Sequence, residues 1–185
     1  MLPLWAKKGG DRLTVRNLAR GALFVAAFAV CAWLAVPVPP VPFTLQSLAL
    51  FLCLLLLGGK HSCAVCAVYL LLGCAGVPVF SGFRGGIGAL LGPTGGYLLG
   101  FLLCCLVYWL LTGIFGSRLT VRLWSLVFGW LLCYGFGTLW LLLYYPEGAL
   151  SLWAAASQYV LPFLLPDAGK LMLALLLEKK LRRFV

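Results

Sequence analysis

LWSLVFGWLLCYGFGTLWLLLY, residues 123–144, carries no charged side chain from its first position to its last. An α-helix needs about 20 mostly apolar residues to cross the hydrocarbon core of a bilayer. A helix that is apolar around its whole circumference, as this one would be, is stable in lipid rather than in water. The segment therefore predicts a membrane-spanning helix.

The composition of the whole chain agrees with that prediction. Of its 185 residues, 64% are hydrophobic and only 10% are charged, whereas a soluble domain is usually about half apolar and about a quarter charged. The formal net charge is +10, but the basic residues form short clusters between apolar runs, as in cytoplasmic loops that face anionic lipid. We therefore expect an integral membrane protein in contact with the lipid bilayer, and no nucleic-acid partner.

Six apolar runs along the chain indicate six spans. The second and third are short for a hydrocarbon core of about 30 Å. In the sixth, Pro162 and Pro166 predict a kink or an unwound turn. We therefore predict an all-α membrane protein with six transmembrane helices, built from a basic N-terminal segment (1–17) and a single six-helix domain (18–185). The runs are residues 18–36, 45–57, 62–77, 94–111, 123–144 and 152–177.

The basic residues predict the orientation of these spans. Of the 14 Lys and Arg residues, all except Arg84 and Lys170 lie in alternate connections or at the ends, as the positive-inside rule requires when both termini are cytoplasmic. They precede the first run, separate the second from the third and the fourth from the fifth, and follow the sixth. These residues are Lys7, Lys8, Arg12, Arg16, Arg20, Lys60, Arg118, Arg122, Lys179, Lys180, Arg182 and Arg183.

Three charged residues are not explained by topology: Arg84, Asp167 and Lys170. A charge at the centre of a spanning helix costs about 3 kcal/mol. One explanation is an ion pair, three residues apart, that holds the sixth helix against its neighbours. Two cations against one anion leave a positive charge that an anionic ligand would balance, and arginine can clamp a carboxylate through two hydrogen bonds. We therefore expect a small ligand that carries a carboxylate.

Neighbouring segments could supply the rest of a binding site. A glycine-rich block around Arg84, residues 81–97, would allow close approach of backbone N–H groups to a ligand, or would be only a flexible connector. Thr44, Gln46 and Tyr97 offer neutral polar groups, although singly such residues are often helix caps or interface anchors. The segment VPVPPVPF, residues 36–43, is expected to be stiff and extended, either as a lid over an outward cavity or as a loop with no ligand role.

Several other classes of function have little support in the sequence. It contains no complete phosphate-binding loop, so ATP hydrolysis by that route is excluded. Cys63 and Cys66 lie near His61, but without a second pair they do not predict a metal site. Asp167 and Lys170 are the only candidates for a general acid–base pair. A small integral membrane enzyme acting on a carboxylate-bearing or lipid substrate is therefore the alternative to a binding protein.

Ala22 and Ala26 lie four residues apart in the first run and share one helix face. Small residues at this spacing allow close helix packing. The partner helix could belong to this chain or to another protein.

Three stretches of the chain resemble the BioY family, the biotin-specific substrate-binding (S) components of energy-coupling factor (ECF) vitamin transporters. The resemblance extends from about residue 15 to the end of the chain. It implies an S-component fold with an outward pocket for biotin, no cofactor, and a multi-pass location in the cytoplasmic membrane of a prokaryotic cell. The stretches are VPFTLQSLA (41–49), GVPVFSGFRGGIGALLGPTGGYLLGF (76–101) and the pattern of Pro162, Phe163, Asp167 and Lys170.

The resemblance also implies roles for individual residues. Arg84, Asp167 and Lys170 fall where the polar ligand contacts of the family lie. Their chemistry suggests that Asp167 would accept hydrogen bonds from the ureido N–H groups of biotin, and that either Arg84 or Lys170 would pair with the valerate carboxylate. The face with Ala22 and Ala26 would dock on a transmembrane coupling subunit, and two ATPase subunits would drive uptake of the tightly bound vitamin from outside to inside. Such a chain is a transport subunit and not an enzyme.

Two departures from the family pattern concern the charged turn. Leu165-Pro166 stands where Pro-Gly usually precedes the aspartate, and Gly169 replaces an apolar residue before Lys170. They bring the local backbone of the turn into question, but they leave the spacing of Asp167 and Lys170 intact.

Overall fold

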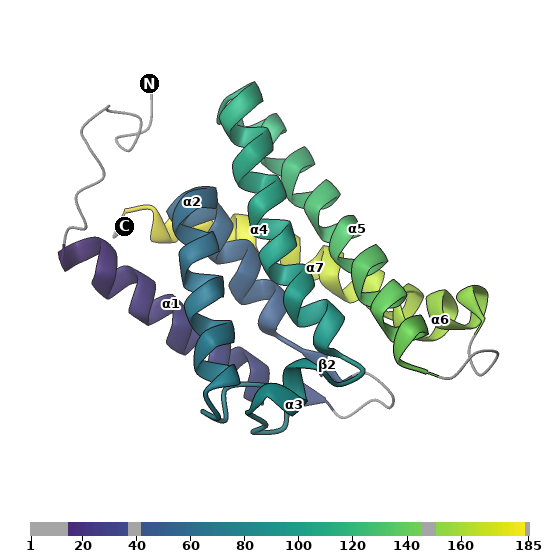
Figure 1. Ribbon diagram of the computed structural model, residues 1–185. Helices are drawn as coiled ribbons and strands as arrows, with labels where there is room; N and C mark the ends of the chain where they lie inside the picture. Colours follow the sequence, from purple (N-terminus) through teal and green to yellow (C-terminus); the bar gives the residue numbers. More distant parts are fainter. Residues whose placement is uncertain (1–14, 37–41, 146–150, 184–185) are drawn as a thin grey trace.

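The computed structural model describes residues 15–36, 42–145 and 151–183, and most of them are helical (Figure 1). Two short strands, β1 and β2, pair antiparallel with Ala35 opposite Thr44. Five stretches are long and apolar enough to cross a membrane, when α6 and α7 are taken together. The elements are α1 (Val15–Trp33), β1 (Ala35–Val36), β2 (Phe43–Thr44), α2 (Gln46–Cys74), α3 (Ile87–Leu90), α4 (Gly95–Phe115), α5 (Leu119–Tyr144), α6 (Leu152–Tyr159) and α7 (Leu161–Leu181).

Helix α2 contains the second and third predicted spans. Its backbone leaves helical geometry at Gly58, where φ is 76° and ψ is 169°, a conformation open mainly to glycine. A straight helix would separate Gln46 from Tyr69 by roughly 35 Å. Instead, Gln46 Nε2 donates a hydrogen bond of 2.7 Å to the Tyr69 hydroxyl. Helix α2 therefore folds back on itself, as Figure 1 shows, and the six predicted spans are present as five continuous stretches.

The sixth predicted span is broken, but not at its prolines. The break lies at Val160, between the end of α6 and the start of α7. Pro162 lies in the first turn of α7, where its missing N–H would have no helical partner in any case. Pro166 lies inside α7, which continues through it. The prediction of an interruption is confirmed, and its place is corrected to the residue before α7.

Close packing of α4 on α5 depends on small residues. A Cβ at Gly100 would lie 2.6 Å from the Cys133 Sγ, and a Cβ at Gly129 would lie 3.1 Å from the Cys104 carbonyl oxygen. The first distance is shorter than real Cβ contacts and the second is tight, so glycine at these positions lets the two helix backbones approach each other. Figure 1 shows α4 and α5 side by side along their length, with α7 passing behind them.

The two ends of the bundle differ in charge as predicted. The turn within α2, next to Lys60, and the turn between α4 and α5, which contains Arg118, both lie at the upper end in Figure 1. The paired strands and α3 lie at the lower end. Arg84, in the connection just before α3, therefore belongs to the end opposite the basic turns. This arrangement agrees with the predicted alternation of cytoplasmic and outer connections.

Arg122 differs from its prediction. The sequence groups it with the basic residues of a connecting loop, but the structure places it in the first turns of α5, buried. Its Nη2 pairs with Glu178 Oε1 of α7 at 2.6 Å and donates to the Leu55 carbonyl oxygen at 2.7 Å. Its Nε donates to the Tyr108 hydroxyl at 3.2 Å. One guanidinium therefore joins α2, α4, α5 and α7.

Replacing Glu178 with glutamine is expected to lower the stability of the protein substantially. The variant leaves the Arg122 charge buried with a weaker partner, and breaking a buried pair in this way costs about 3 kcal/mol. Thermal unfolding in detergent measures the effect, with Lys179→Gln, an exposed neighbour on the same turn, as the control. Equal melting temperatures for the two variants would contradict a stabilising role for this ion pair.

Candidate functional site

A cavity of about 210 Å³ lies inside the bundle. Its walls come from β2, the start of α2, the glycine-rich connection before α4, the first turns of α4, and parts of α5, α6 and α7. The predicted substrate-binding residues come from segments far apart in the sequence, and the fold brings all of them to this cavity. These residues are Thr44, Gln46, Arg84, Tyr97, Asp167 and Lys170.

Asp167 is the buried anion of the cavity, with a residue exposure of 6%. Its Oδ1 accepts hydrogen bonds from Ser47 Oγ and from Lys170 Nζ, each at 2.8 Å. Its Oδ2 accepts a hydrogen bond from the Tyr134 hydroxyl. An ionised carboxylate can accept about four hydrogen bonds. These contacts therefore leave about one acceptor position for a ligand, on the Oδ2 side.

Lys170 is equally buried, and its hydrogen-bonding capacity is fully used. The ammonium group has three N–H donors. It donates to the Thr44 carbonyl oxygen at 2.7 Å, to Ser47 Oγ at 3.0 Å and to Asp167 Oδ1 at 2.8 Å. It also lies 3.9 Å from the centre of the Phe43 ring, a favourable cation–π position. Lys170 is thus held by β2, α2 and α7 without any ligand.

Arg84 differs from Lys170 in both exposure and hydrogen bonding. Its residue is exposed, and its guanidinium makes no hydrogen bond or ion pair with the part of the chain that the structure describes. Only its backbone is fixed, because Phe80 N–H donates to the Arg84 carbonyl oxygen at 2.9 Å. Among the described residues of the cavity wall, the charged ones are Arg84, Asp167 and Lys170. Asp167 and Lys170 neutralise each other, so the net positive charge of the cavity resides on Arg84.

The neutral polar residues are tied to the scaffold. The Thr44 hydroxyl donates to Gln46 Oε1 at 3.0 Å. Gln46 donates to Tyr69, whose hydroxyl donates in turn to the Val79 carbonyl oxygen at 2.9 Å. This chain of hydrogen bonds links β2 to the segment that precedes Arg84. Tyr97, on α4, lies 3.3 Å from Thr138 Oγ1 through its hydroxyl oxygen.

Sequence reasoning missed three polar residues of this site: Ser47, Tyr134 and Trp130. Ser47 bridges the two charges, and Tyr134 holds the second oxygen of Asp167. The indole N–H of Trp130 is buried in the cavity wall and has no acceptor among the described residues. Trp130 and Tyr134 are four residues apart on one face of α5, with ring centres 5.3 Å apart. Two polar aromatic residues at this spacing within an apolar span could have indicated this part of the site from the sequence.

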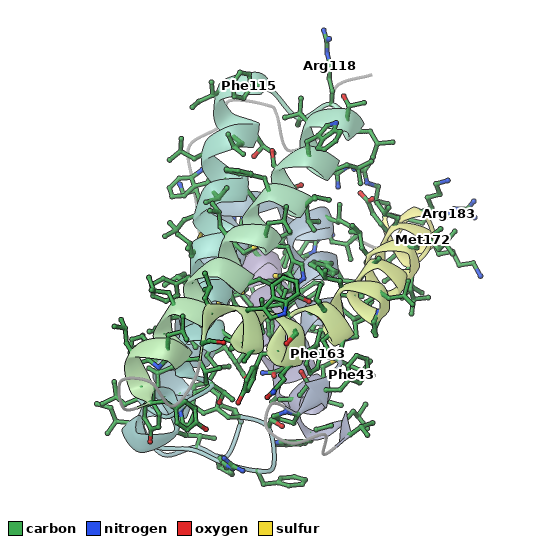
Figure 2. All side chains as sticks on the ribbon, turned by 90° about the vertical axis from the view of Figure 1, so that its right-hand side faces the viewer. Phe43, Phe115, Arg118, Phe163, Met172 and Arg183 are labelled. Carbon is green, nitrogen blue, oxygen red and sulfur yellow. The ribbon has the colours of Figure 1, made fainter. Side chains whose placement is uncertain are left out.

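Two aromatic rings pack beside the cluster. Figure 2 shows Phe43 and Phe163 near each other at the start of α7, with ring centres 6.2 Å apart and nearly parallel planes. Phe163 lines the cavity, whereas Phe43 covers Lys170. The ion pair is therefore shielded from water by apolar surface, which strengthens its electrostatic interaction.

The two departures in the charged turn lie on the outer face of α7. Leu165 and Gly169 are exposed, and a Cβ built at Gly169 would meet no atom within 4 Å. Neither residue lines the cavity. The helix therefore places Asp167 and Lys170 on its inner face regardless of these substitutions.

Two further expectations concern surfaces outside the cavity. Ala22 and Ala26 lie on an exposed face of α1, so the described part of the chain does not cover them. Most of the segment VPVPPVPF falls at residues 37–41, outside the described residues, and its proposed role as a lid is not tested by the structure.

Comparison with known proteins identifies relatives that match most of the chain. A family model described as the BioY family matches residues 6–185. The probable biotin transporter BioY of Pyrococcus horikoshii is 37% identical over 170 residues, which cover 92% of this chain and 98% of the relative. The biotin transporter BioY of Thermotoga maritima is 47% identical over 97 residues, but this alignment spans only 57% of that relative.

One solved structure has the same fold over nearly the whole chain. It is a crystal structure of the S-component for biotin from an ECF-type ABC transporter, with a TM-score of 0.79 and 26% sequence identity. The match covers 95% of each chain. It confirms the predicted all-α S-component fold of a multi-pass membrane protein.

The ionised state of the Asp167–Lys170 pair can be tested through stability. Lys170→Met leaves a buried carboxylate with no cation, which is expected to cost about 3 kcal/mol. Adding Asp167→Asn removes that charge, so the double variant is expected to recover most of the loss. Thermal unfolding of the ligand-free protein measures both effects, with the exposed Lys180→Met as the control. A double variant no more stable than Lys170→Met alone would contradict an ion pair at this position.

Proposed function

The chain belongs to the BioY family, and we propose that it is the biotin-binding S component of an ECF-type ABC transporter, with biotin as its transported ligand. The observation that carries this proposal is the charge arrangement of the cavity. A buried carboxylate with one free acceptor position lies on one wall, and an arginine without a partner among the described residues lies on another. A ligand with N–H donors and a carboxylate matches both.

Each part of biotin has a complementary group in the cavity. The ureido ring has two N–H donors, and Asp167 Oδ2 retains acceptor capacity for one of them. The apolar thiophane ring and the alkyl chain suit a wall of aromatic side chains that includes Phe101, Trp130 and Phe163. The indole N–H of Trp130, which has no acceptor in the described chain, can donate to an acceptor atom of the ligand.

The contacts favour Arg84 over Lys170 as the partner of the ligand carboxylate. If Lys170 turned to the ligand carboxylate, it would give up hydrogen bonds to Thr44 and Ser47 and weaken the pairing of Asp167. Hydrogen bonds to charged groups contribute about 1.5–3 kcal/mol each, so this exchange is unfavourable. Arg84 loses no hydrogen bond to the described chain when it binds, and its planar fork matches a carboxylate. Arg84 therefore binds the carboxylate, and Lys170 holds Asp167 in place.

The alternative of a membrane enzyme has lost its support. The relatives reported above are named as transporters, and family membership confirms the prediction of a transport subunit. Lys170 has no donor to spare, because its three N–H groups already bind Thr44, Ser47 and Asp167.

The transporter complex supplies the energy for uptake. We propose that the exposed face of Ala22 and Ala26 docks on a transmembrane coupling subunit, which joins this chain to two ATPase subunits. Small residues on an uncovered helix face allow another helix to approach closely. Biotin enters from the end that holds Arg84, and both termini lie at the opposite, cytoplasmic side of a prokaryotic cell membrane.

The role of Arg84 predicts a loss of affinity that depends on the carboxylate of the ligand. Arg84→Gln is expected to weaken biotin binding about 10- to 100-fold, the effect of losing a charged hydrogen-bond pair. Binding of biotinamide, which lacks the negative charge, is expected to change little. Isothermal titration of the purified protein measures both affinities, and Arg118→Gln, at the other end of the bundle, is the control.

An equal loss of affinity for both ligands would mean that Arg84 does not recognise the carboxylate. Unchanged affinity for biotin would contradict its place in the site altogether.

A further inference from the structure

The last residue of α1 contacts the segment that carries Arg84. Trp33 Nε1 donates a hydrogen bond of 2.8 Å to the Pro78 carbonyl oxygen. Its ring also stacks on Phe83, with centroids 5.1 Å apart and planes inclined by 22°. Phe83 directly precedes Arg84 in the sequence. A residue outside the cavity wall thus contacts the segment before Arg84 through two separate interactions, one of them with the residue next to Arg84.

Phe83 adopts an unusual backbone conformation. Its φ is 57°, and it is the one non-glycine residue with positive φ in the described chain. Bulky side chains rarely occupy this left-handed region, so the conformation requires support from the surroundings. The preceding aromatic residue of the turn points the other way, because Phe80 is buried and packs edge-on against Tyr69 at 5.6 Å. Phe83 is 64% exposed, and its ring stacks on the ring of Trp33.

The C-terminal end of α1, which carries Trp33, is itself held in place by backbone hydrogen bonds. The Cys31 carbonyl oxygen accepts a hydrogen bond from Leu45 N–H at 3.1 Å. Two residues after Trp33, Ala35 pairs with Thr44 in the small sheet. Thr44 is the residue whose carbonyl oxygen holds Lys170. Trp33 is therefore anchored to the wall that carries the ion pair, and it reaches from there to the wall that carries Arg84.

We propose that Trp33 is a positioning residue for Arg84, and that it thereby sets the preference of the site for ligands with a carboxylate. Its hydrogen bond and ring hold Phe83 outward in the strained conformation, so the next side chain is directed to the cavity. This inference rests on the proposed role of Arg84. A tryptophan that serves only as a membrane-interface anchor would keep its N–H for water or headgroups, whereas the Trp33 N–H binds Pro78.

The test is ligand discrimination in the purified full-length chain. Trp33→Phe removes the hydrogen bond and keeps an aromatic ring, and it is expected to weaken biotin binding about fivefold, the effect of one lost hydrogen bond. Binding of biotinamide is expected to stay unchanged. In a background of Arg84→Gln, Trp33→Phe is expected to have no effect on either ligand. Trp124→Phe, at a residue that is 74% exposed, is the matched control.

A second variant tests whether a general folding defect could explain the loss of affinity. Phe83→Gly removes the stacking partner of Trp33, but glycine accepts a φ of 57° without strain. It is therefore expected to fold and still to lose affinity for biotin selectively over biotinamide.

The outcomes separate the two proposals. If Trp33→Phe weakens both ligands equally, or still weakens biotin when Arg84 is already glutamine, Trp33 acts on the fold or the cavity wall and the positioning role is overturned. Unchanged affinity for biotin in Trp33→Phe also overturns it. If Arg84→Gln itself fails to discriminate between the ligands, the assignment of Arg84 falls, and the role of Trp33 falls with it.

Discussion

The buried ion pair between Asp167 and Lys170 is the constraint on which the rest of the site depends. Neither charge is stable in the interior of a membrane protein unless its hydrogen bonds are satisfied there. The structure meets this requirement with groups from three elements: the Thr44 carbonyl oxygen of β2, Ser47 of α2 and Tyr134 of α5. The same contacts fix the start of α7 against β2 and α2, and they define one wall of the cavity.

A comparison of the two buried charge clusters shows what distinguishes a binding site from a structural one. Arg122 and Glu178 also form a buried ion pair, and Arg182 adds a second cation to Glu178 at 2.9 Å. None of these three residues lines the cavity. The cluster joins helices near the basic end of the bundle and leaves no unbalanced charge facing an internal space. Burial of charge alone therefore does not identify a ligand site; a cavity and an unpartnered group are needed as well.

The proposed roles of the two cations rest on their hydrogen-bonding capacity. Each of the three N–H donors of Lys170 has an acceptor within the described chain, so Lys170 stabilises the structure of the site. Arg84 lies on a turn with a strained neighbour and makes no side-chain contact of this kind with the described residues. The cavity wall thus carries an anion whose hydrogen bonds are largely satisfied and a cation with no side-chain partner among the described residues. In the proposed function both take part in binding, the cation through the ligand carboxylate and the anion through its remaining acceptor position.

Much of this arrangement could be predicted from the sequence, because lipid imposes simple rules on composition. Apolar runs and basic clusters predicted the spans and their orientation, and the charges that this topology left unexplained indicated Arg84, Asp167 and Lys170. Arg122 was misplaced because a basic residue at the edge of a span looks the same in a loop as in the first turns of a helix. The turn at Gly58 lies in the predicted connection between the second and third spans, but its tightness, which lets α2 run almost without interruption, depends on a single φ value that no composition reveals. Ser47 was missed because a lone hydroxyl within an apolar run has no distinctive pattern until the fold gives it a partner, whereas Tyr134 could have been found from its spacing of four residues from Trp130.

The most direct measurement is an experimental structure of this protein with biotin bound. The account predicts a ureido nitrogen within hydrogen-bond distance of Asp167, the carboxylate paired with the Arg84 guanidinium, and Lys170 still bonded to Thr44 and Ser47. A carboxylate bound to Lys170, with Arg84 turned away from the ligand, would contradict it.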